Sequence, residues 1–437
     1  MIEIDYILHG DYLVTMSDDS SPIIDGAVAV KNGKIVDIGI YTDLNKKYAP
    51  LEIINGGIIM PGLINTHCHA AMVYFRGYAD DLHLLDWLEK YIWPAERKWL
   101  SNEFVTDAVE LAVLEMLCAG ITTYSDMYFY QGAAAKSVKK LGIRAVLASG
   151  VIDFPTKTTK CAQDCIDNAV RFIKDFKDEP MISPSIALHS PYTCCPDTYI
   201  KSKEASVNHN VLLQTHLSET QWEVDEILKR YGRRPVEHLD YYNILDSNVL
   251  ASHCVWLDDK EIDIVAKAET GVSHCINSNL KLASGIARVP EMLNKGINVA
   301  LGTDGAASNN NLDILNEMSI AARLHKAIVK DSSALKAKEA LRMATINGAR
   351  ALGLSEKIGS IEKGKSADII IGSITKPHLV PIYDIYSHIV YSMSSADIDT
   401  VMVDGKVLIR VGHLANGADV EIIEKANHWG RRIAESV

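Results

Sequence analysis

Eight apolar runs in the middle of the chain constrain the fold more than any other feature of the sequence. Most of them are separated by stretches with helical periodicity, such as EFVTDAVELAVLEMLCAG. Apolar strands that alternate with helices are typical of a parallel sheet covered on both faces, and eight of them predict a closed (β/α)8 TIM barrel. A doubly wound open sheet is the alternative, although no GxGxxG motif follows any run. The runs span residues 58–66, 121–125, 143–151, 182–188, 211–215, 248–252, 271–273 and 297–301.

The two ends of the chain differ from the middle in their predicted secondary structure. Both alternate short strand-like segments with turns, and the dipeptides Asn32-Gly33 and Asp404-Gly405 mark a hairpin in each. Neither end alone has enough strands to bury two faces. We therefore expect one small β-sandwich formed by residues 1–57 and 358–437, with a barrel of residues 58–357 inserted between them.

Composition and charge limit the binding partners and the cellular compartment that can be expected for this protein. A net charge of −12 argues against binding to nucleic acid or to an anionic membrane. The N-terminal segment MIEIDYILHGDYLVTM lacks the features of a secretory signal, and no stretch is apolar enough to span a bilayer, so a cytoplasmic protein is expected. The eight cysteines form no CxxC pair, which favours free thiols over a disulfide framework.

Six of the eight predicted strands end in a histidine or an aspartate. Catalytic residues of parallel barrels lie at the carboxyl edge of the strands, so these side chains should gather at one mouth of the barrel. The residues are His67 with His69, His189, His216 with Glu219 close behind it, His253, His274 and Asp304.

Four of these residues form a candidate metal site. Residues two apart in a strand point to the same face, so His67 and His69 can aim together into the barrel. With His216 and Asp304 they offer the nitrogen and oxygen ligands that suit zinc or another borderline divalent ion. Each residue alone is more often an ordinary polar residue at a strand end. Their shared position at one edge makes the metal site the favoured interpretation.

Stretches spread almost from end to end match one known family. They resemble the amidohydrolase superfamily and, within it, the 5′-methylthioadenosine/S-adenosylhomocysteine deaminases. The resemblance implies a barrel inserted in a β-sandwich and a single divalent ion: Zn2+ in the first place, with Fe2+ and Mn2+ as alternatives. His189 stands where two-metal relatives carry a bridging carboxylated lysine, which argues against a second ion. The matching stretches are PGLINTHCHAAM, FRGYADDLHLLDWLEKYIWPAE, AGITTYSDMY, HSPYTC, THLSET, HCVWL, SNLKLASGIARVP, LGTDGAASNNNLD, ATINGARALGL and GSIEKGKSADI.

The resemblance also assigns roles to individual residues. The metal ligands of the family correspond to His67, His69, His216 and Asp304. Its catalytic positions correspond to Glu219, His253 and, again, Asp304. Its substrate pocket corresponds to Trp87, Glu96, His189 and Ser308.

Two positions depart from the family pattern at the far end of the substrate. Ser149, in the sequence ASG, stands where relatives often have an arginine, and Lys160 corresponds to a second family arginine. The family uses these arginines at the 5′ substituent of the nucleoside. Ser149 and Lys160 are therefore candidate substrate-binding residues, and the preferred 5′ group stays open.

The implied reaction is hydrolytic deamination of 5′-methylthioadenosine, S-adenosylhomocysteine or adenosine to the inosine analogue and ammonia. Metal-bound hydroxide would attack purine C6, with Asp304 accepting the water proton and His253 directing the attack. Glu219 would protonate N1, although it can also be read as part of the first turn of a helix capped by Ser218. Glu96 would accept both ribose hydroxyls.

Two alternatives to this function stay open. The first is an aminohydrolase or chlorohydrolase acting on another heteroaromatic compound, such as guanine, a pterin or an s-triazine, which would not need Glu96. The second is a non-catalytic binding or scaffold protein, which would be expected to lack some of the ligands or the acid. The expected partner is a small-molecule nucleoside, and the resemblance allows a homo-oligomer.

Overall fold

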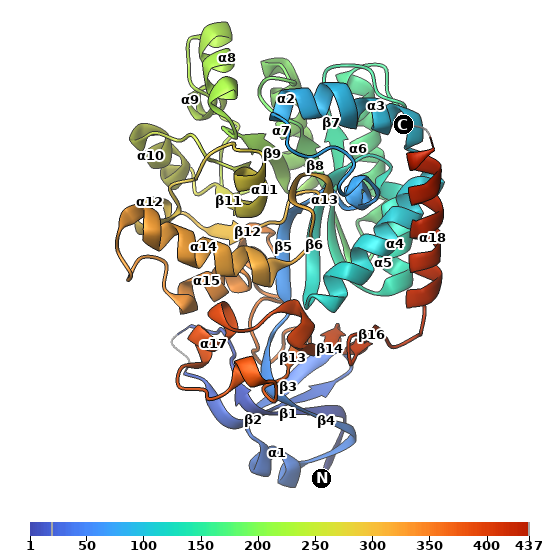
Figure 1. Cartoon of the computed structure of the whole chain (residues 1–437), viewed down its shortest axis with the longest axis vertical. Coiled ribbons are helices and arrows are strands. Elements are labelled where there is room, and N and C mark those ends of the chain that lie inside the picture. Colours follow the sequence, from blue (N-terminus) through green and yellow to red (C-terminus); the bar gives the residue numbers. More distant parts are fainter. Residues whose placement is uncertain (19–20, 436–437) are drawn as a thin grey trace.

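The computed structural model of the chain describes residues 1–18 and 21–435, which form two eight-stranded sheets at opposite ends of the molecule (Figure 1). One sheet is parallel and surrounded by helices. The other is mixed and combines strands from both ends of the chain. The predicted barrel with a separate β unit built from the two chain ends is confirmed.

The parallel sheet follows the chain in unbroken order from β5 to β12. The side-chain hydroxyl of Thr66 donates to the carbonyl of Leu301 at 2.8 Å, which links the first and the last strand of the barrel. Each strand overlaps one of the predicted apolar runs. The strands are β5 (Leu63–Cys68), β6 (Ile121–Tyr128), β7 (Arg144–Val151), β8 (Ile182–Leu188), β9 (Leu213–Leu217), β10 (Val249–His253), β11 (Gly271–His274) and β12 (Val299–Leu301).

Helices cover the outside of the barrel, and local signals set their ends. In the helix of residues 102–118, the hydroxyl of Ser101 accepts from the amide of Phe104 at 3.1 Å, and the chain turns at Gly120 with a φ of +82°. No helix in the ranges 1–18 and 21–435 has the length and apolarity needed to cross a membrane. The longer barrel helices are α4 (Asn102–Cys118), α5 (Gln131–Leu141), α6 (Ala162–Phe176), α7 (Pro196–His209) and α14 (Ile314–Val329).

The predicted run at residues 58–66 is divided between the two sheets. Its first part belongs to β4 (Tyr48–Pro61) of the mixed sheet, and its second part is β5 of the barrel. The chain changes partners at Gly62, whose amide donates to the carbonyl of Asp368, whereas the next amide donates to Gly120. A Cβ atom at Gly62 would lie 2.1 Å from the hydroxyl of Thr122, so only glycine fits this crossing.

The mixed sheet joins the two ends of the chain along β4. This strand pairs in parallel with β1 and antiparallel with β13. The predicted hairpins lie at Asn32-Gly33 and Asp404-Gly405, between β2 and β3 and between β14 and β15. The strands besides β4 are β1 (Ile2–Leu13), β2 (Ile23–Lys31), β3 (Lys34–Ile40), β13 (Ile369–Gly372), β14 (Ile398–Val403), β15 (Lys406–Arg410) and β16 (His413–Leu414).

The C-terminal part of the chain contacts both units. Arg144, at the start of β7, is 2% exposed and forms a two-pronged ion pair with Asp368 just before β13, at 2.9 and 3.1 Å. The C-terminal helix α18 (Asp419–Ala434) lies beside α4 (Figure 1), and the indole of Trp429 donates to Asp107 there at 3.0 Å. The domain boundaries at residues 58 and 357 stay a prediction. Helix α18 belongs to the predicted C-terminal part of the β unit but packs against the barrel helix α4.

Candidate active site

Three histidines and an aspartate meet at the carboxyl end of the barrel. His67 and His69 lie at the end of β5 and directly after it, His216 lies on β9, and Asp304 follows β12. The Oδ1 atom of Asp304 is 3.4 Å from Nε2 of His67 and 3.2 Å from Nε2 of His69. The Nε2 atoms of His69 and His216 are 3.3 Å apart. All four side chains offer a ligand atom to one small volume.

These spacings fit a bound divalent ion. In tetrahedral geometry, metal–ligand bonds of about 2.0–2.2 Å place neighbouring ligand atoms roughly 3.3–3.6 Å apart. The three separations, 3.2, 3.3 and 3.4 Å, lie close to the lower end of this range. Nε2 of His67 is buried and has no hydrogen-bond partner, which is costly unless a cation occupies the centre. The residues present therefore fit a divalent metal.

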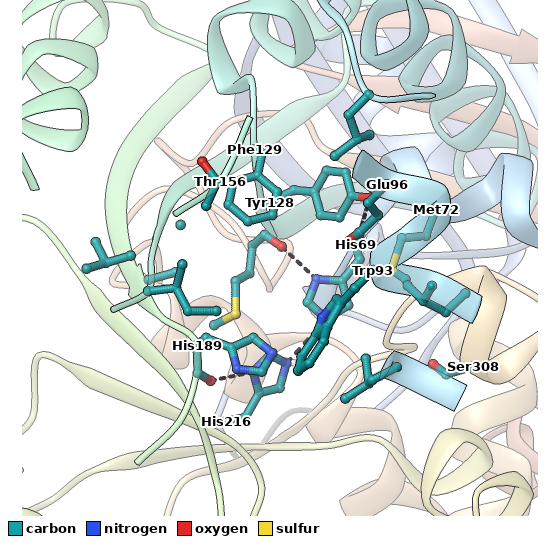
Figure 2. A pocket seen from close by; sticks show the side chains of 18 of the residues that line it. His69, Met72, Trp93, Glu96, Tyr128, Phe129, Thr156, His189, His216 and Ser308 are labelled. Carbon is teal, nitrogen blue, oxygen red and sulfur yellow. Dashed lines mark hydrogen bonds between the residues drawn. The ribbon is translucent and has the colours of Figure 1, made fainter. Parts of the chain in front are cut away.

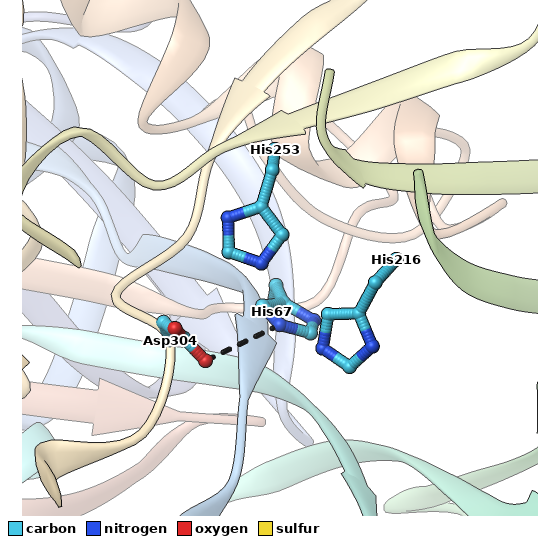
Figure 3. A group of neighbouring side chains, drawn as sticks. All are labelled: His67, His216, His253 and Asp304. Atoms are coloured by element: carbon cyan, nitrogen blue, oxygen red, sulfur yellow. Dashed lines mark ion pairs between the residues drawn. The ribbon is translucent and has the colours of Figure 1, made fainter. Parts of the chain in front are cut away.

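His253 is a further candidate for this centre. One ligand atom from each of His67, His216, His253 and Asp304 lies within 4.8 Å of the others (Figure 3). The Nε2 atom of His253 has no hydrogen-bond partner and lies 3.9 Å from Oε2 of Glu219. His253 can therefore complete the coordination or stand beside it, facing the carboxylate of Glu219.

Hydrogen bonds on the outer side of the imidazoles fix their tautomers. Nδ1 of His69 donates to the carbonyl of Met127, and Nδ1 of His216 donates to the carbonyl of His189, both at 2.6 Å. Nδ1 of His253 lies 2.9 Å from the side-chain oxygen of Asn279. Because carbonyl and amide oxygens only accept, each Nδ1 carries a proton and each Nε2 is turned to the centre.

The protonation states suit metal binding. Burial lowers the pKa of His67 to about 4 and the pKa of His216 well below its usual value, so both rings are neutral near pH 7. Burial is the largest single influence on His69 and acts to lower its pKa, but the hydrogen bond and charge of Asp304, the carbonyl of Met127 and the charge of Asp126 together raise this pKa to about 9. A cation at the centre would displace that proton, because metal ligands bind in their deprotonated form.

The carboxylate of Asp304 is held from several sides. Its Oδ2 atom accepts from the hydroxyls of Ser278 at 2.6 Å and Ser308 at 2.8 Å, and its Oδ1 atom accepts from the amide of Gly305. Ser308 lines the pocket as expected, but its hydroxyl is directed to Asp304. These bonds leave Oδ1 facing the histidines.

Glu219 precedes a helix instead of lying within its first turn. The helix α8 (Gln221–Tyr231) is capped by Thr220, and not by Ser218 as the helical interpretation expected. The amides of Ser218 and Glu219 donate to the carboxylate of Glu223 at 2.8 and 2.9 Å, which fixes the turn. Burial raises the pKa of Glu219, which favours a group that holds and releases a proton.

A pocket extends from the metal centre, and Figure 2 shows part of its lining. Glu96 on α3 (Trp93–Trp99) accepts from the hydroxyl of Tyr128 at 2.5 Å, and burial raises its pKa to about 7. Among the residues predicted from the sequence, those that line the pocket are Trp87, Glu96, His189, Ser308, Glu219, His253, His69, His216 and Asp304.

Ser149 and Lys160 are not brought to this pocket. Ser149 lines a separate surface groove beside α6. Lys160 is exposed, and its backbone amide donates to Asp164 at 2.8 Å. The far end of the pocket is lined by residues 152 and 154–158, immediately after β7.

Sequence reasoning missed several residues that support the site. Tyr128 ends β6 in the same way as the predicted histidines end their strands, so the strand-end rule would have found it. Asn279 lies in α11 (Ile276–Lys281), and only the tertiary fold brings it to His253. The carbonyls of Met127 and His189 carry no sequence signal, because every residue has one.

Comparisons with known proteins agree with this geometry. The model of the Amidohydrolase family matches residues 58–408. A 5-methylthioadenosine/S-adenosylhomocysteine deaminase of Thermodesulfovibrio yellowstonii is 49% identical, with 99% of each chain covered. A 5′-deoxyadenosine deaminase of Methanosarcina acetivorans is 43% identical, with 97% of this chain and 96% of the relative covered. The crystal structure of a zinc-bound adenosine deaminase of Xanthomonas campestris superposes with a TM-score of 0.97 at 34% identity, with 99% of each chain covered.

Proposed function

Because the chain belongs to the amidohydrolase family, we propose that it is a metal-dependent deaminase of adenosine-type nucleosides. It replaces the exocyclic amine at purine C6 by oxygen and releases ammonia. The observation that carries the proposal is that a cluster of three histidines and one aspartate adjoins a pocket that is also lined by the buried carboxyl of Glu219 and by Glu96. The relatives named as deaminases of methylthioadenosine and deoxyadenosine support the choice of substrate.

Zinc is the proposed ion, with Fe2+ and Mn2+ as alternatives. The mixed nitrogen and oxygen ligand set suits zinc, and a zinc ion is bound in the adenosine deaminase structure from Xanthomonas campestris. His67, His69, His216 and Asp304 would hold it. When bound, the ion lowers the pKa of a water molecule towards about 7, which provides a nucleophile at neutral pH.

The protein groups around the centre then divide the proton transfers. Asp304 can take the proton of the attacking water. Two serine hydroxyls hold its Oδ2 atom, which fixes the orientation of the carboxylate. His253, with Nδ1 committed to Asn279, directs its Nε2 lone pair at that water. Glu219 delivers a proton to purine N1, and burial, which raises its pKa, favours the protonated form that this role needs.

The ribose is bound by Glu96. A carboxylate with two oxygens can accept from two neighbouring hydroxyls, and Tyr128 holds one of these oxygens in place. This residue favours a nucleoside over a free base. An enzyme for guanine, a pterin or an s-triazine would need no carboxylate for ribose hydroxyls.

The partners and compartment follow from the same proposal. A net charge of −12 supports a small-molecule substrate and no nucleic-acid partner. The eight free cysteines support a reducing compartment such as the cytoplasm. Whether the chain forms a homo-oligomer stays a prediction.

Ammonia release from a panel of nucleosides and free bases tests the function. The metal-loaded protein should release ammonia from adenosine-type nucleosides and not from guanine, pterins or triazines. Reaction with the free bases alone would overturn the nucleoside assignment. The absence of a stoichiometric divalent ion by mass spectrometry, together with no turnover, would favour a binding or scaffold protein.

A further inference from the structure

The far end of the pocket is built differently from the end that holds the metal centre. Figure 2 places Thr156 on the opposite side of the pocket from His216 and Ser308. If purine C6 faces the metal and Glu96 holds the ribose, the 5′ substituent points to this far end. This step depends on the proposed function. The far end includes the apolar residues Trp93, Leu100, Ile152, Phe154 and Pro155 and the polar residues Arg97, Thr156, Lys157 and Thr158.

The surface of the far end is largely apolar. The rings of Trp93 and Phe154 meet edge to face with their centres 5.6 Å apart, which joins α3 to the segment after β7. Ile152 and Leu100 are buried beside them. An apolar substituent gains stability from burial here, whereas a charged one loses hydration without replacement.

Lys157, at this end of the pocket, forms hydrogen bonds with the protein backbone. Nζ of Lys157 donates to the carbonyls of Leu100 at 2.7 Å and Lys98 at 3.2 Å, at the C-terminal end of α3. These bonds tie the segment after β7 to the helix that carries Glu96. The ammonium therefore serves to hold the two walls of the pocket together.

Among the described residues that line the far end, none other than Glu96 offers a carboxylate to the ammonium of an amino acid. Glu96 already accepts from Tyr128. The neighbouring carboxylate of Asp153 accepts from the amide of Cys195 at 2.7 Å and the hydroxyl of Thr198 at 2.6 Å, and it does not line the pocket. Arg97 lines the pocket but is exposed, so solvent screens its guanidinium from a carboxylate and from an ammonium alike.

We propose that this pocket selects nucleosides with a small uncharged 5′ substituent, such as methylthio or hydrogen, and disfavours those whose 5′ chain ends in an amino acid. The apolar surface formed by Trp93, Ile152 and Phe154 binds the substituent. The positions Ser149 and Lys160, where the family often has arginines, lie outside the pocket and supply no charge to it.

Steady-state kinetics with the metal-loaded enzyme test the proposal. We expect kcat/KM for 5′-methylthioadenosine and 5′-deoxyadenosine to exceed that for S-adenosylhomocysteine at least tenfold, with most of the difference in KM. Equal or better use of S-adenosylhomocysteine would overturn the selectivity and leave the deaminase function intact. No turnover of any adenosine-type nucleoside would overturn both.

Variants separate the contributions at the far end. Phe154 is 39% exposed, so Phe154→Ala should fold normally and lower kcat/KM for 5′-methylthioadenosine several-fold, with a smaller effect on adenosine. Lys174→Ala, on the exposed face of α6, is the matched control. Arg97→Ala should change the ratio between methylthioadenosine and S-adenosylhomocysteine less than twofold. A tenfold loss confined to S-adenosylhomocysteine would show that Arg97 binds the carboxylate, and would overturn the proposal.

Binding of the deaminated products gives a readout independent of turnover. Isothermal titration calorimetry should show 5′-methylthioinosine binding at least tenfold more tightly than S-inosylhomocysteine. The reverse order would contradict the proposed selectivity even if the kinetic ratio held.

Discussion

The side-chain oxygen of Asn279 accepts a hydrogen bond from Nδ1 of His253 at 2.9 Å, and both residues are fully buried. The contact joins β10 to α11, two elements that sequence periodicity alone does not bring together. It decides which ring nitrogen of His253 faces the metal centre. The orientation of a proposed catalytic group thus depends on an amide that never reaches the substrate.

Replacement of Asn279 should therefore impair turnover without removing the metal. We expect Asn279→Ala to lower kcat about 10–100-fold, the usual cost of losing a residue that orients a site histidine. Asn279→Asp keeps an acceptor for Nδ1 and should retain more activity. Loss of bound metal in Asn279→Ala would indicate that His253 is itself a ligand.

Glu219→Gln should keep the metal and lose most of the turnover. Positioned proton transfer contributes about 10²–10⁴-fold to rates, and glutamine cannot supply the proton. Two measurements test this: kcat with 5′-methylthioadenosine, and metal content by mass spectrometry. Glu226→Gln, at a half-buried residue of α8 that pairs with Arg230, is the control, and unchanged turnover in Glu219→Gln would remove Glu219 from the mechanism.

Single alanine variants should distinguish the two histidines that compete for the metal centre. His69→Ala should lose the stoichiometric ion, because Nε2 of His69 lies close to ligand atoms of both Asp304 and His216. His253→Ala should keep the ion and lose turnover. The opposite result, with metal lost only in His253→Ala, would replace His69 by His253 in the ligand set.

The KM for nucleosides should rise as the pH falls below about 7. Burial raises the pKa of Glu96 to about 7, above its ordinary value near 4.5, so the carboxylate becomes protonated in this range and accepts fewer bonds from the ribose. Glu96→Gln should have a high KM that no longer depends on pH between 6 and 8, values chosen to bracket the pKa of about 7. A parallel pH profile in wild type and Glu96→Gln would assign the effect to another group.

Removal of one partner of the buried ion pair between the two sheets should destabilise the protein. Arg144→Met leaves Asp368 with an uncompensated buried charge, and breaking such pairs costs about 3–5 kcal/mol. The double variant Arg144→Met/Asp368→Leu should recover part of this loss. Thermal unfolding measures both, and equal stability of wild type and Arg144→Met would show that the pair contributes nothing.

The sequence predicted the barrel and the gathering of residues at its mouth because both depend on strand periodicity. His67, His69, His216 and Asp304 each follow an apolar run, and parallel strands bring all their carboxyl ends to one edge. It did not predict the division of residues 58–66 between two sheets, because β4 and β5 are both apolar and only Gly62 separates them.

The far end of the pocket could not be predicted for a different reason. Ser149 and Lys160 were placed by resemblance to a family position, but the path of a loop depends on its own contacts. Here Lys157 and Phe154 fix the segment after β7 against α3, and Ser149 lines the groove beside α6. Side chains in loops follow no period that the sequence displays.

The single-glycine crossing at Gly62 bears on how a nucleoside enters and leaves. Only Gly62 separates β4 from β5, and Arg144 pairs with Asp368 across the two units. These two connections oppose a hinge motion between the mixed sheet and the barrel. Entry of the nucleoside and release of the product would then depend on small displacements of α3 and of the segment after β7, which Lys157 links to each other.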